Sequence, residues 1–247
     1  MKNKFIFDLD DTLISTEYHY TQAKAKAVDY IVFLLGKKTP GVNEIVKTIE
    51  DIDDKAVKEL PNPYCIERYP DSLAKAMQSL CDDRKVKWSE KNVEEMLAIG
   101  NTAFETPATD IVPGAEETLN FLLYQKDSLM LLTKGDDNYQ MQKVIANGLD
   151  RWFARNSIKV INSDKTPTAI LSLLGNHDKE HSYSVGNYYR SDIEPAIDAG
   201  IKAVYVPNGS WKHELVKNSI EKALQTKRAV VLDSIIEIKN KYSELFE

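Results

Sequence analysis

The chain of 247 residues is poor in cysteine and has no long hydrophobic run. Its two cysteines, Cys65 and Cys81, match neither a metal-binding nor a redox spacing, which argues against a zinc site or a disulfide framework. The longest apolar run, residues 27–35, contains Asp29 and is much too short to cross a membrane. No apolar segment typical of a signal peptide precedes the first predicted strand. We therefore expect a cytoplasmic protein with no membrane partner.

The chain also lacks an excess of positive charge. It carries 32 Lys and Arg against 38 Asp and Glu, a formal net charge of −6 at pH 7. This balance argues against nucleic acid as the main partner, because binding to phosphate backbones depends on clustered positive charge. Apolar residues at 43% and charged residues at 28% are ordinary for a globular protein. The length suits one large domain or two modest ones.

Three acidic residues follow the first predicted strand almost at once. Residues 5–7 form a short apolar run typical of a buried strand, and Asp8, Asp10 and Asp11 come directly after it. Carboxylates packed this closely repel one another unless a cation lies among them. Ligand sites of open α/β sheets lie beyond the carboxyl ends of the strands. The pattern predicts a metal-assisted site in which Asp8 or Asp10 does covalent or acid–base work. The alternative, that these acids cap helices or make turns, explains one or two of them.

Two patterns divide the chain into parts. Residues 16–107 show helical spacing of apolar residues and no convincing strand, with helices expected at 20–35, 42–60, 71–81 and 89–104. From residue 110 onward, short apolar strands alternate with helical segments. These strands are expected at 128–132, 158–161, 182–185, 203–206 and 229–232. The alternation predicts an α/β fold, a Rossmann-like parallel sheet with helices on both faces. Residues 1–15 and 108–247 would form this domain, and 16–107 a small all-helical domain.

Polar residues recur where the predicted strands end. Thr133 and Gly135 follow one strand, Lys165 precedes the helix start at Thr166–Pro167, and Asn187 and Asp192 follow another strand. Singly, each is explained equally well as a strand end, a surface lysine, a turn residue or part of a capping box at 191–194. Together with the acids after the first strand, they offer oxygens for Mg²⁺, a hydroxyl for phosphate oxygens and a lysine for charge. Their joint occurrence favours a phosphoryl site.

These segments resemble the four motifs of the haloacid dehalogenase (HAD) superfamily, in its phosphatase branch. Residues 8–13, Asp-Leu-Asp-Asp-Thr-Leu, are similar to the first motif, and residues 131–135, Leu-Leu-Thr-Lys-Gly, to the second. Lys165 matches the third, and residues 186–192, Gly-Asn-Tyr-Tyr-Arg-Ser-Asp, match the fourth. The helical block after the first strand resembles the cap that this family carries in its first insertion position.

The resemblance implies a catalytic role for four residues. Asp8 would attack phosphorus and become an aspartyl phosphate, which splits one difficult step into two. Asp10 would protonate the leaving oxygen and then take a proton from the attacking water. Thr133 would hold phosphoryl oxygens, and Lys165 would screen the charge between Asp8 and phosphate. Because a departing halide needs no proton, Asp10 favours phosphate-ester hydrolysis over carbon–halogen cleavage.

The same resemblance implies Mg²⁺ as cofactor, with one departure from the family's pattern. The metal would be bound by Asp8, by Asp10 through its backbone carbonyl, and by the fourth motif, with waters completing an octahedron. That motif commonly begins Gly-Asp, and this chain has Gly186-Asn187. Asn keeps an oxygen ligand but removes a negative charge. Asn187 and Asp192 are therefore both candidate ligands.

Further residues are candidates for contact with the substrate. Thr133, Lys134 and Gly135 would surround the phosphoryl group. In the helical block, Arg68 lies between two tyrosines and could pair with a second anionic group. The alternative, which we favour, is that this group packs one cap helix against its neighbours.

The leading interpretation is a Mg²⁺-dependent phosphatase that hydrolyses a small phosphorylated metabolite. A phosphomutase would keep the same residues and need only exclude water. A non-catalytic HAD-like binding protein stays open because of Asn187. A phospho-acceptor signalling domain also uses clustered acids, but the helical insertion fits that compact fold poorly. The sequence does not identify the substrate or the oligomeric state.

Overall fold

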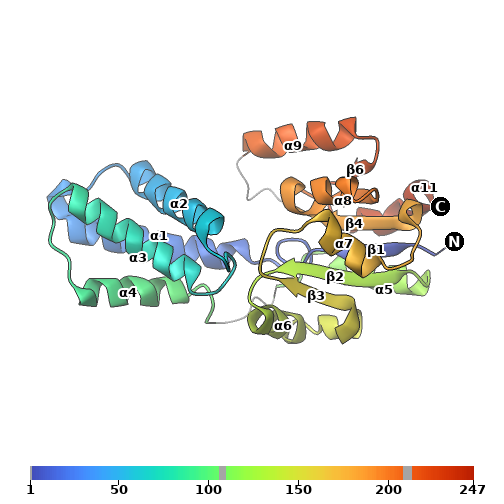
Figure 1. Cartoon of the computed structure of the whole chain (residues 1–247), viewed down its shortest axis with the longest axis horizontal. Coiled ribbons are helices and arrows are strands. Elements are labelled where there is room, and N and C mark those ends of the chain that lie inside the picture. Colours follow the sequence, from blue (N-terminus) through green and yellow to red (C-terminus); the bar gives the residue numbers. More distant parts are fainter. Residues whose placement is uncertain (1, 106–109, 208–212) are drawn as a thin grey trace. The chain divides into compact units, whose positions relative to one another are not determined.

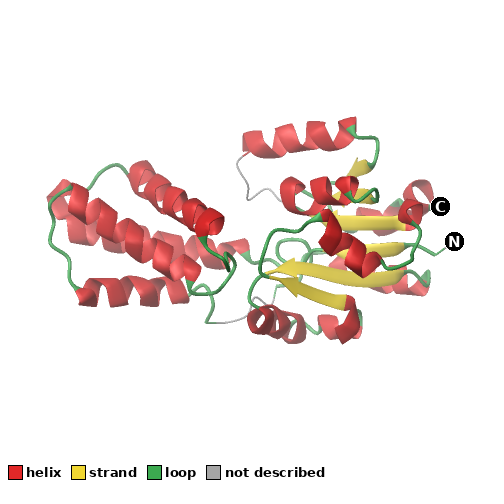
Figure 2. Cartoon of the chain, in the orientation of Figure 1, coloured by secondary structure: helices red, strands yellow, loops and turns green. Residues whose placement is uncertain are grey.

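The computed structural model describes residues 2–105, 110–207 and 213–247 (Figure 1). The chain forms two compact units, Met1–Thr16 with Ala108–Glu247, and Glu17–Pro107. We call the first the α/β unit and the second the helical unit. Among the described residues, all strands belong to the α/β unit (Figure 2).

The α/β unit is built on a six-stranded sheet in which all neighbouring strands are parallel. The strand order is β3-β2-β1-β4-β5-β6, so β1 lies in the interior, between β2 and β4. The strands are β1 (Lys4–Phe7), β2 (Ser128–Lys134), β3 (Ile158–Ile161), β4 (Ser182–Gly186), β5 (Lys202–Tyr205) and β6 (Ala229–Val231). The structure therefore confirms the predicted Rossmann-like parallel sheet.

The three central strands are parallel and in contact, so their carboxyl ends lie at the same edge of the sheet. Phe7 pairs with Leu131 of β2 and with Val185 of β4. The backbone N–H of Asp8 donates to the carbonyl of Val185 at 2.9 Å, which continues the ladder one residue past β1. Polar residues that follow these strands therefore meet at one edge of the sheet, where ligand sites of such folds lie.

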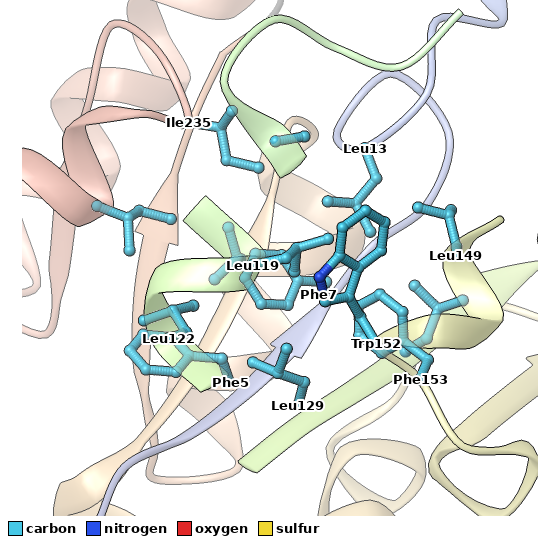
Figure 3. Close-up of a cluster of buried hydrophobic side chains, with 14 of the residues drawn as sticks. Phe5, Phe7, Leu13, Leu119, Leu122, Leu129, Leu149, Trp152, Phe153 and Ile235 are labelled. Atoms are coloured by element: carbon cyan, nitrogen blue, oxygen red, sulfur yellow. The ribbon is translucent and has the colours of Figure 1, made fainter. Parts of the chain in front are cut away.

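Helices cover both faces of the sheet, and each face has its own apolar core. Phe5 and Phe7 pack on one face with Leu119 and Leu122 (Figure 3), whereas Ile6 packs on the other. The first face is covered by α5 (Ala115–Tyr124), α6 (Asp137–Ala146), α10 (Glu237–Asn240) and α11 (Tyr242–Phe246), and the second by α7 (Pro167–Leu174), α8 (Glu194–Asp198) and α9 (His213–Gln225). Burial on both faces explains the continuous apolar runs of the central strands, residues 5–7 in β1 and 129–132 in β2.

The structure confirms one predicted helix start near the sheet edge and corrects another. Thr166 caps α7 by accepting a hydrogen bond from the backbone of Ala169, and Pro167 occupies the first turn. The capping box predicted at residues 191–194 is wrong. Residues Tyr189–Ile193 form a turn of π-helix before α8, and the Asp192 carboxylate accepts from the backbone N–H of Tyr188.

The helical unit has an independent core. Its helices are α1 (Glu17–Leu35), α2 (Val42–Glu59), α3 (Arg68–Asp83) and α4 (Glu90–Asn101). Buried side chains from all four helices, including Ile31, Ile45, Leu73 and Met96, pack together. Residues 17–105 contain no strand. No helix in the described part of the chain combines the length and the apolar character needed to cross a membrane.

Candidate active site

Lys165 joins two acidic side chains at the carboxyl edge of the sheet. Its Nζ lies 2.6 Å from Asp8 Oδ1 and 2.7 Å from Asp192 Oδ1. The exposed fractions of the three side chains are 4% for Lys165, 12% for Asp8 and 2% for Asp192. Water and salt screen such buried charges weakly. Three predicted site residues from distant parts of the sequence therefore lie in direct contact.

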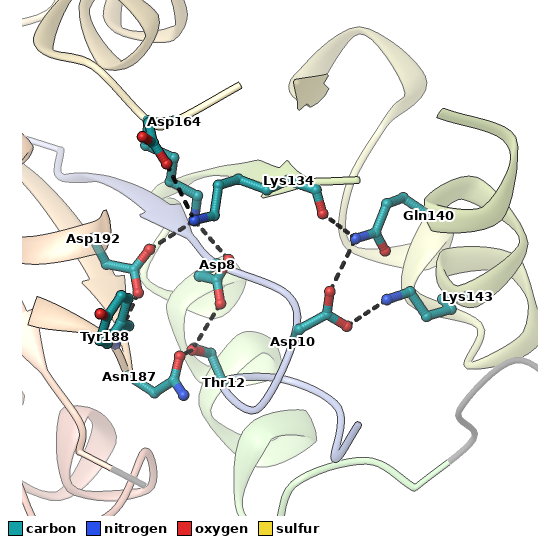
Figure 4. Close-up of polar contacts among 11 residues, drawn as sticks. Asp8, Asp10, Thr12, Lys134, Gln140, Lys143, Asp164, Asn187, Tyr188 and Asp192 are labelled. Carbon is teal, nitrogen blue, oxygen red and sulfur yellow. Dashed lines mark hydrogen bonds and ion pairs between the residues drawn. The ribbon is translucent and has the colours of Figure 1, made fainter. Parts of the chain in front are cut away.

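Thr12 links the segment that follows β1 to the segment that follows β4. Its hydroxyl lies 3.3 Å from Asp8 Oδ2 and 3.3 Å from Asn187 Oδ1. A hydroxyl has one proton, so it can donate to only one of these two oxygens at a time. Asn187 is buried, and its side-chain oxygen and the carboxylate of Asp8 both point toward the Thr12 hydroxyl (Figure 4). Asp8 thus has one oxygen on Lys165 and the other next to the Thr12 hydroxyl, which also reaches the side-chain oxygen of Asn187.

Asp10 lies apart from this cluster and is bonded by α6. Asp10 Oδ1 is 2.5 Å from Lys143 Nζ, and Oδ2 accepts from Gln140 Nε2 at 2.9 Å. Lys143 and Gln140 are buried, whereas 30% of the Asp10 side chain is exposed. Asp10 is therefore accessible to solvent on one side and fixed by two donors on the other.

Asp11, the third acid of the stretch, has a structural role. Its backbone φ is 57°, in the left-handed region that Asp tolerates in turns. Its carboxylate accepts from the backbone N–H of Thr16 at 2.8 Å and lies 3.2 Å from the Thr16 hydroxyl. The turn interpretation considered for the acidic stretch thus holds for Asp11.

The end of β2 contributes a buried hydroxyl. Thr133 is 1% exposed, and its Oγ1 has no hydrogen-bond partner among the described residues. An unsatisfied buried hydroxyl at a strand tip is chemically suited to an external acceptor such as a phosphoryl oxygen.

Lys134 lies 3.7 Å from the exposed carboxylate of Asp164. The backbone N–H of Gly135 donates to the carbonyl of Ile161 at 3.0 Å, so the sheet already uses this amide.

Burial sets the electrostatics of the cluster. Burial raises the pKa of Asp8 to about 7, and the nearby Asp192 and Asp10 add to this, whereas the ammonium of Lys165 opposes it. Burial also disfavours the charge of Lys165, but Asp192 and Asp8 outweigh this effect and raise the pKa of the lysine. Burial, with the neighbouring Lys165, lowers the pKa of Lys134. Lys165 is therefore a permanent cation, and Asp8 is a carboxylate whose charge depends on its partners.

The oxygen donors fit a magnesium ion held by few protein groups. In the described part of the chain, no group of three or more His, Cys, Asp or Glu is placed to hold a metal. The carboxylate of Asp192 is bonded to Lys165 and to the backbone of Tyr188. The converging oxygens of Asp8 and Asn187 are the suitable pair, since Mg²⁺ often takes one or two protein oxygens and completes its shell with water and phosphate.

Gly186 allows Asp192 to approach the strand. A Cβ at this position would lie 2.3 Å from the Cβ and Cγ of Asp192, closer than any real contact. The glycine of the fourth motif is thus needed for packing, because it admits the acid that pairs with Lys165.

Arg68, predicted as a substrate contact, belongs to the helical unit. It forms an ion pair with Asp53, and both side chains are largely buried. The neighbouring Tyr69 is buried and donates its hydroxyl to the carbonyl of Tyr20 at 3.1 Å. These contacts favour the packing interpretation of this group. They also identify Asp53, on α2, as the partner of Arg68.

Three residues of the site were not predicted: Thr12, Gln140 and Lys143. Thr12 lies within the first motif, and a hydroxyl one turn after Asp8 was a usable signal. Gln140 and Lys143 are three residues apart on α6, a spacing that places both side chains on one helix face. In sequence, such polar residues on a helix are indistinguishable from a solvated face.

No protein-family model matches the chain, and no curated protein matches it. Solved structures match over most of its length. A haloacid dehalogenase-like family hydrolase from Xanthomonas campestris is 20% identical, with 99% of this chain and 92% of that chain covered and a TM-score of 0.73. A HAD phosphatase from Thermococcus onnurineus is 18% identical, with 100% and 99% covered and a TM-score of 0.58.

A structure from Bacillus subtilis, assigned to the HAD-hydrolases and bound to magnesium, is 16% identical, with 83% of this chain and 89% of that chain covered and a TM-score of 0.54. A 2-haloacid dehalogenase from Pseudomonas syringae matches as well, so the fold by itself does not separate phosphatases from dehalogenases. At these identities the likeness concerns the fold. The resemblance drawn from the four motifs is confirmed at this level, and the chain has the fold of the haloacid dehalogenase-like hydrolases.

Proposed function

We propose that the protein is a Mg²⁺-dependent phosphatase that hydrolyses a small phosphate monoester through an aspartyl phosphate on Asp8. The observation that carries the proposal is the contact of Lys165 with Asp8, at 2.6 Å between two largely buried side chains, together with a second acid, Asp10, that α6 holds separately. A nucleophilic carboxylate, a fixed cation and a separate acid–base group are the parts that such a reaction needs. Asp10 also favours this reaction over dehalogenation, because a halide leaves without a proton.

In the first step, an oxygen of Asp8 forms a bond to phosphorus and the bond from phosphorus to the ester oxygen breaks. The electron pair of that bond stays on the leaving oxygen, which takes a proton from Asp10. In the second step, water attacks phosphorus, the bond to Asp8 breaks and its electron pair returns to the carboxylate. Asp10 accepts the proton that the water loses. No net proton is therefore left on the protein.

The other residues hold charge and orientation in this scheme. Lys165 keeps one oxygen of Asp8 fixed and offsets the negative charge of the phosphoryl group. The hydroxyl of Thr133, which has no partner in the described part of the chain, would donate to a phosphoryl oxygen, and Lys134 would add positive charge nearby. A Mg²⁺ ion held by Asp8 and Asn187 would supply further positive charge at the phosphoryl oxygens. The magnesium-bound B. subtilis structure supports this choice of ion.

Release of inorganic phosphate tests the proposal. A set of phosphorylated metabolites, including sugar phosphates, nucleotides and small phospho-acids, is incubated with the protein and Mg²⁺. We expect repeated turnover on at least one ester, and loss of turnover in Asp8→Asn. A phosphomutase would convert an ester without releasing phosphate, and a non-catalytic binding protein would do neither. Either of these results would contradict the proposed hydrolysis.

The setting of the protein in the cell is part of the same proposal. Cys65 and Cys81 are free thiols, which is consistent with a reducing compartment such as the cytoplasm. The role of the helical unit as a substrate-selecting cap stays a prediction from the family resemblance.

A further inference from the structure

Lys143 is a buried lysine whose charge is directed at Asp10. The residue is 3% exposed, and its Nζ lies 2.5 Å from Asp10 Oδ1. One turn earlier on α6, Gln140 is also 3% exposed and donates to Asp10 Oδ2 at 2.9 Å. Each oxygen of the Asp10 carboxylate therefore has its own donor, and both donors come from the same helix (Figure 4).

Stability alone gives a poor account of this arrangement. Removing an ammonium group from water costs several kcal/mol, and apolar residues in place of a buried ion pair are often neutral or stabilising, by ~1–4 kcal/mol. Lys143 is itself buried, so an apolar side chain at this position would avoid the cost of removing a charge from water. Lys143 instead directs its positive charge at Asp10, whose side chain is still 30% exposed.

The end of β2 holds α6 where this contact is possible. Gly135 has a φ of 149°, and a Cβ there would lie 2.6 Å from Gln140 Nε2. The same amide nitrogen also donates to the carbonyl of Lys134. Asp136 then caps α6 by accepting from the backbone N–H of Tyr139 at 3.0 Å. The helix thus begins directly against the strand tip, and its first turns carry Gln140 and Lys143 to Asp10.

We propose that Lys143 and Gln140 are positioning residues that hold the Asp10 carboxylate in the orientation needed to exchange a proton with the leaving oxygen. This inference rests on the phosphatase function proposed above. Two donors on two different oxygens prevent rotation of the carboxylate, and each oxygen keeps a second lone pair that can bind a proton. A proton donor held in place is effective, whereas a freely rotating one loses most of its advantage.

The test is the dependence of kcat/KM on the leaving group, measured with aryl and alkyl phosphates of increasing leaving-group pKa. Lys143→Met and Gln140→Met keep most of the side-chain volume and remove one donor each. We expect losses of ~10²-fold for alkyl phosphates, as for a misplaced catalytic group, and little loss for dinitrophenyl phosphate, whose leaving oxygen needs no proton. Lys143→Arg, which keeps a cation, should recover part of the loss.

Lys159→Met is the matched control, because this lysine lies on β3, is only half-buried, and donates to the hydroxyl of Ser172 at 2.6 Å. If the variants lose the same factor of kcat/KM for every leaving group, Lys143 and Gln140 are merely structural. If kcat/KM of the variants equals that of the wild type, the proposal is also overturned. If Lys143→Met does not fold, Gln140→Met and Lys143→Arg carry the same comparison. A wild-type protein that hydrolyses no ester would refute the phosphatase proposal, and the positioning role with it. An active wild type with equal leaving-group dependence in all variants would refute only the positioning role.

Discussion

Removal of the Lys165 ammonium group should destabilise the α/β unit. The size of this loss depends on how deeply the ion pairs of Lys165 are buried. Lys165→Met leaves the carboxylates of Asp8 and Asp192 facing each other without a cation. For a surface pair, the loss would be ~0–1 kcal/mol. Because only 4% of the Lys165 side chain and 2% of the Asp192 side chain are exposed, the value for a broken buried pair applies, ~3–5 kcal/mol of unfolding free energy.

The pH dependence of this loss follows from Asp8. Burial raises the pKa of Asp8 from 3.8 to about 7. By itself, a raised pKa favours the folded state fully below 3.8, and this contribution is lost as the pH rises through about 7. Lys165 stabilises the ionised form of Asp8, which prevails above pH 7. The difference in stability between the wild type and Lys165→Met should therefore be largest above pH 7 and should narrow as the pH falls through 7.

Urea unfolding at pH 8 and at pH 5 measures this difference. Trp88→Phe is used as the background for all variants, because Trp88 is in the helical unit and the remaining tryptophans then lie in the α/β unit. Lys159→Met serves as control, and its effect should stay within ~0.5 kcal/mol, as for most surface substitutions. A Lys165→Met protein as stable as this control at pH 8 would refute the reasoning, as would a difference that does not narrow at pH 5.

Three further predictions concern the site and the opposite end of the sheet. Asn187→Asp adds a negative charge beside Asp8, so the Mg²⁺ concentration for half-maximal phosphate release should fall; an unchanged value would exclude Asn187 as a ligand. Gly186→Ala places a Cβ 2.3 Å from the side chain of Asp192, so unfolding free energy should drop by ~1–3 kcal/mol and turnover should fall; wild-type values of both would contradict the packing argument. Burial raises the pKa of Asp127, so the wild type should lose stability relative to Asp127→Asn as the pH rises from 3.8 through that raised pKa; parallel pH profiles of the two proteins would contradict this.

The sequence was sufficient for the parts of the site that lie at strand tips. Strands buried on both faces leave apolar runs that are easy to see, and in a parallel sheet their carboxyl ends meet at one edge. Asp8, Lys165, Asn187 and Asp192 could be placed together on this basis. The alternation of strands and helices likewise identified the Rossmann-like sheet and the helical segment that interrupts it.

Residues on helices could not be placed in the same way. Lys143 contacts Asp10 because one face of α6 is turned toward Asp10. The helical spacing of polar residues in the sequence does not show whether such a face is buried in the fold or exposed to solvent. Arg68 presents the same problem, since its partner Asp53 lies on another helix, and nothing in the sequence pairs the two residues. Asp192 lies in a π-helical turn and pairs with Lys165, a long-range contact that local capping patterns do not contain.

Chemical trapping of the covalent intermediate tests the central claim most directly. The protein is mixed with Mg²⁺ and its best ester, quenched within the first turnovers, and treated with borohydride, which reduces an acyl phosphate to an alcohol. Peptide mass spectrometry then locates the reduced residue. The account predicts reduction at Asp8 alone, dependent on the ester and absent from Asp8→Asn. Phosphate release with no reduction at Asp8, or with reduction at another residue, would contradict it.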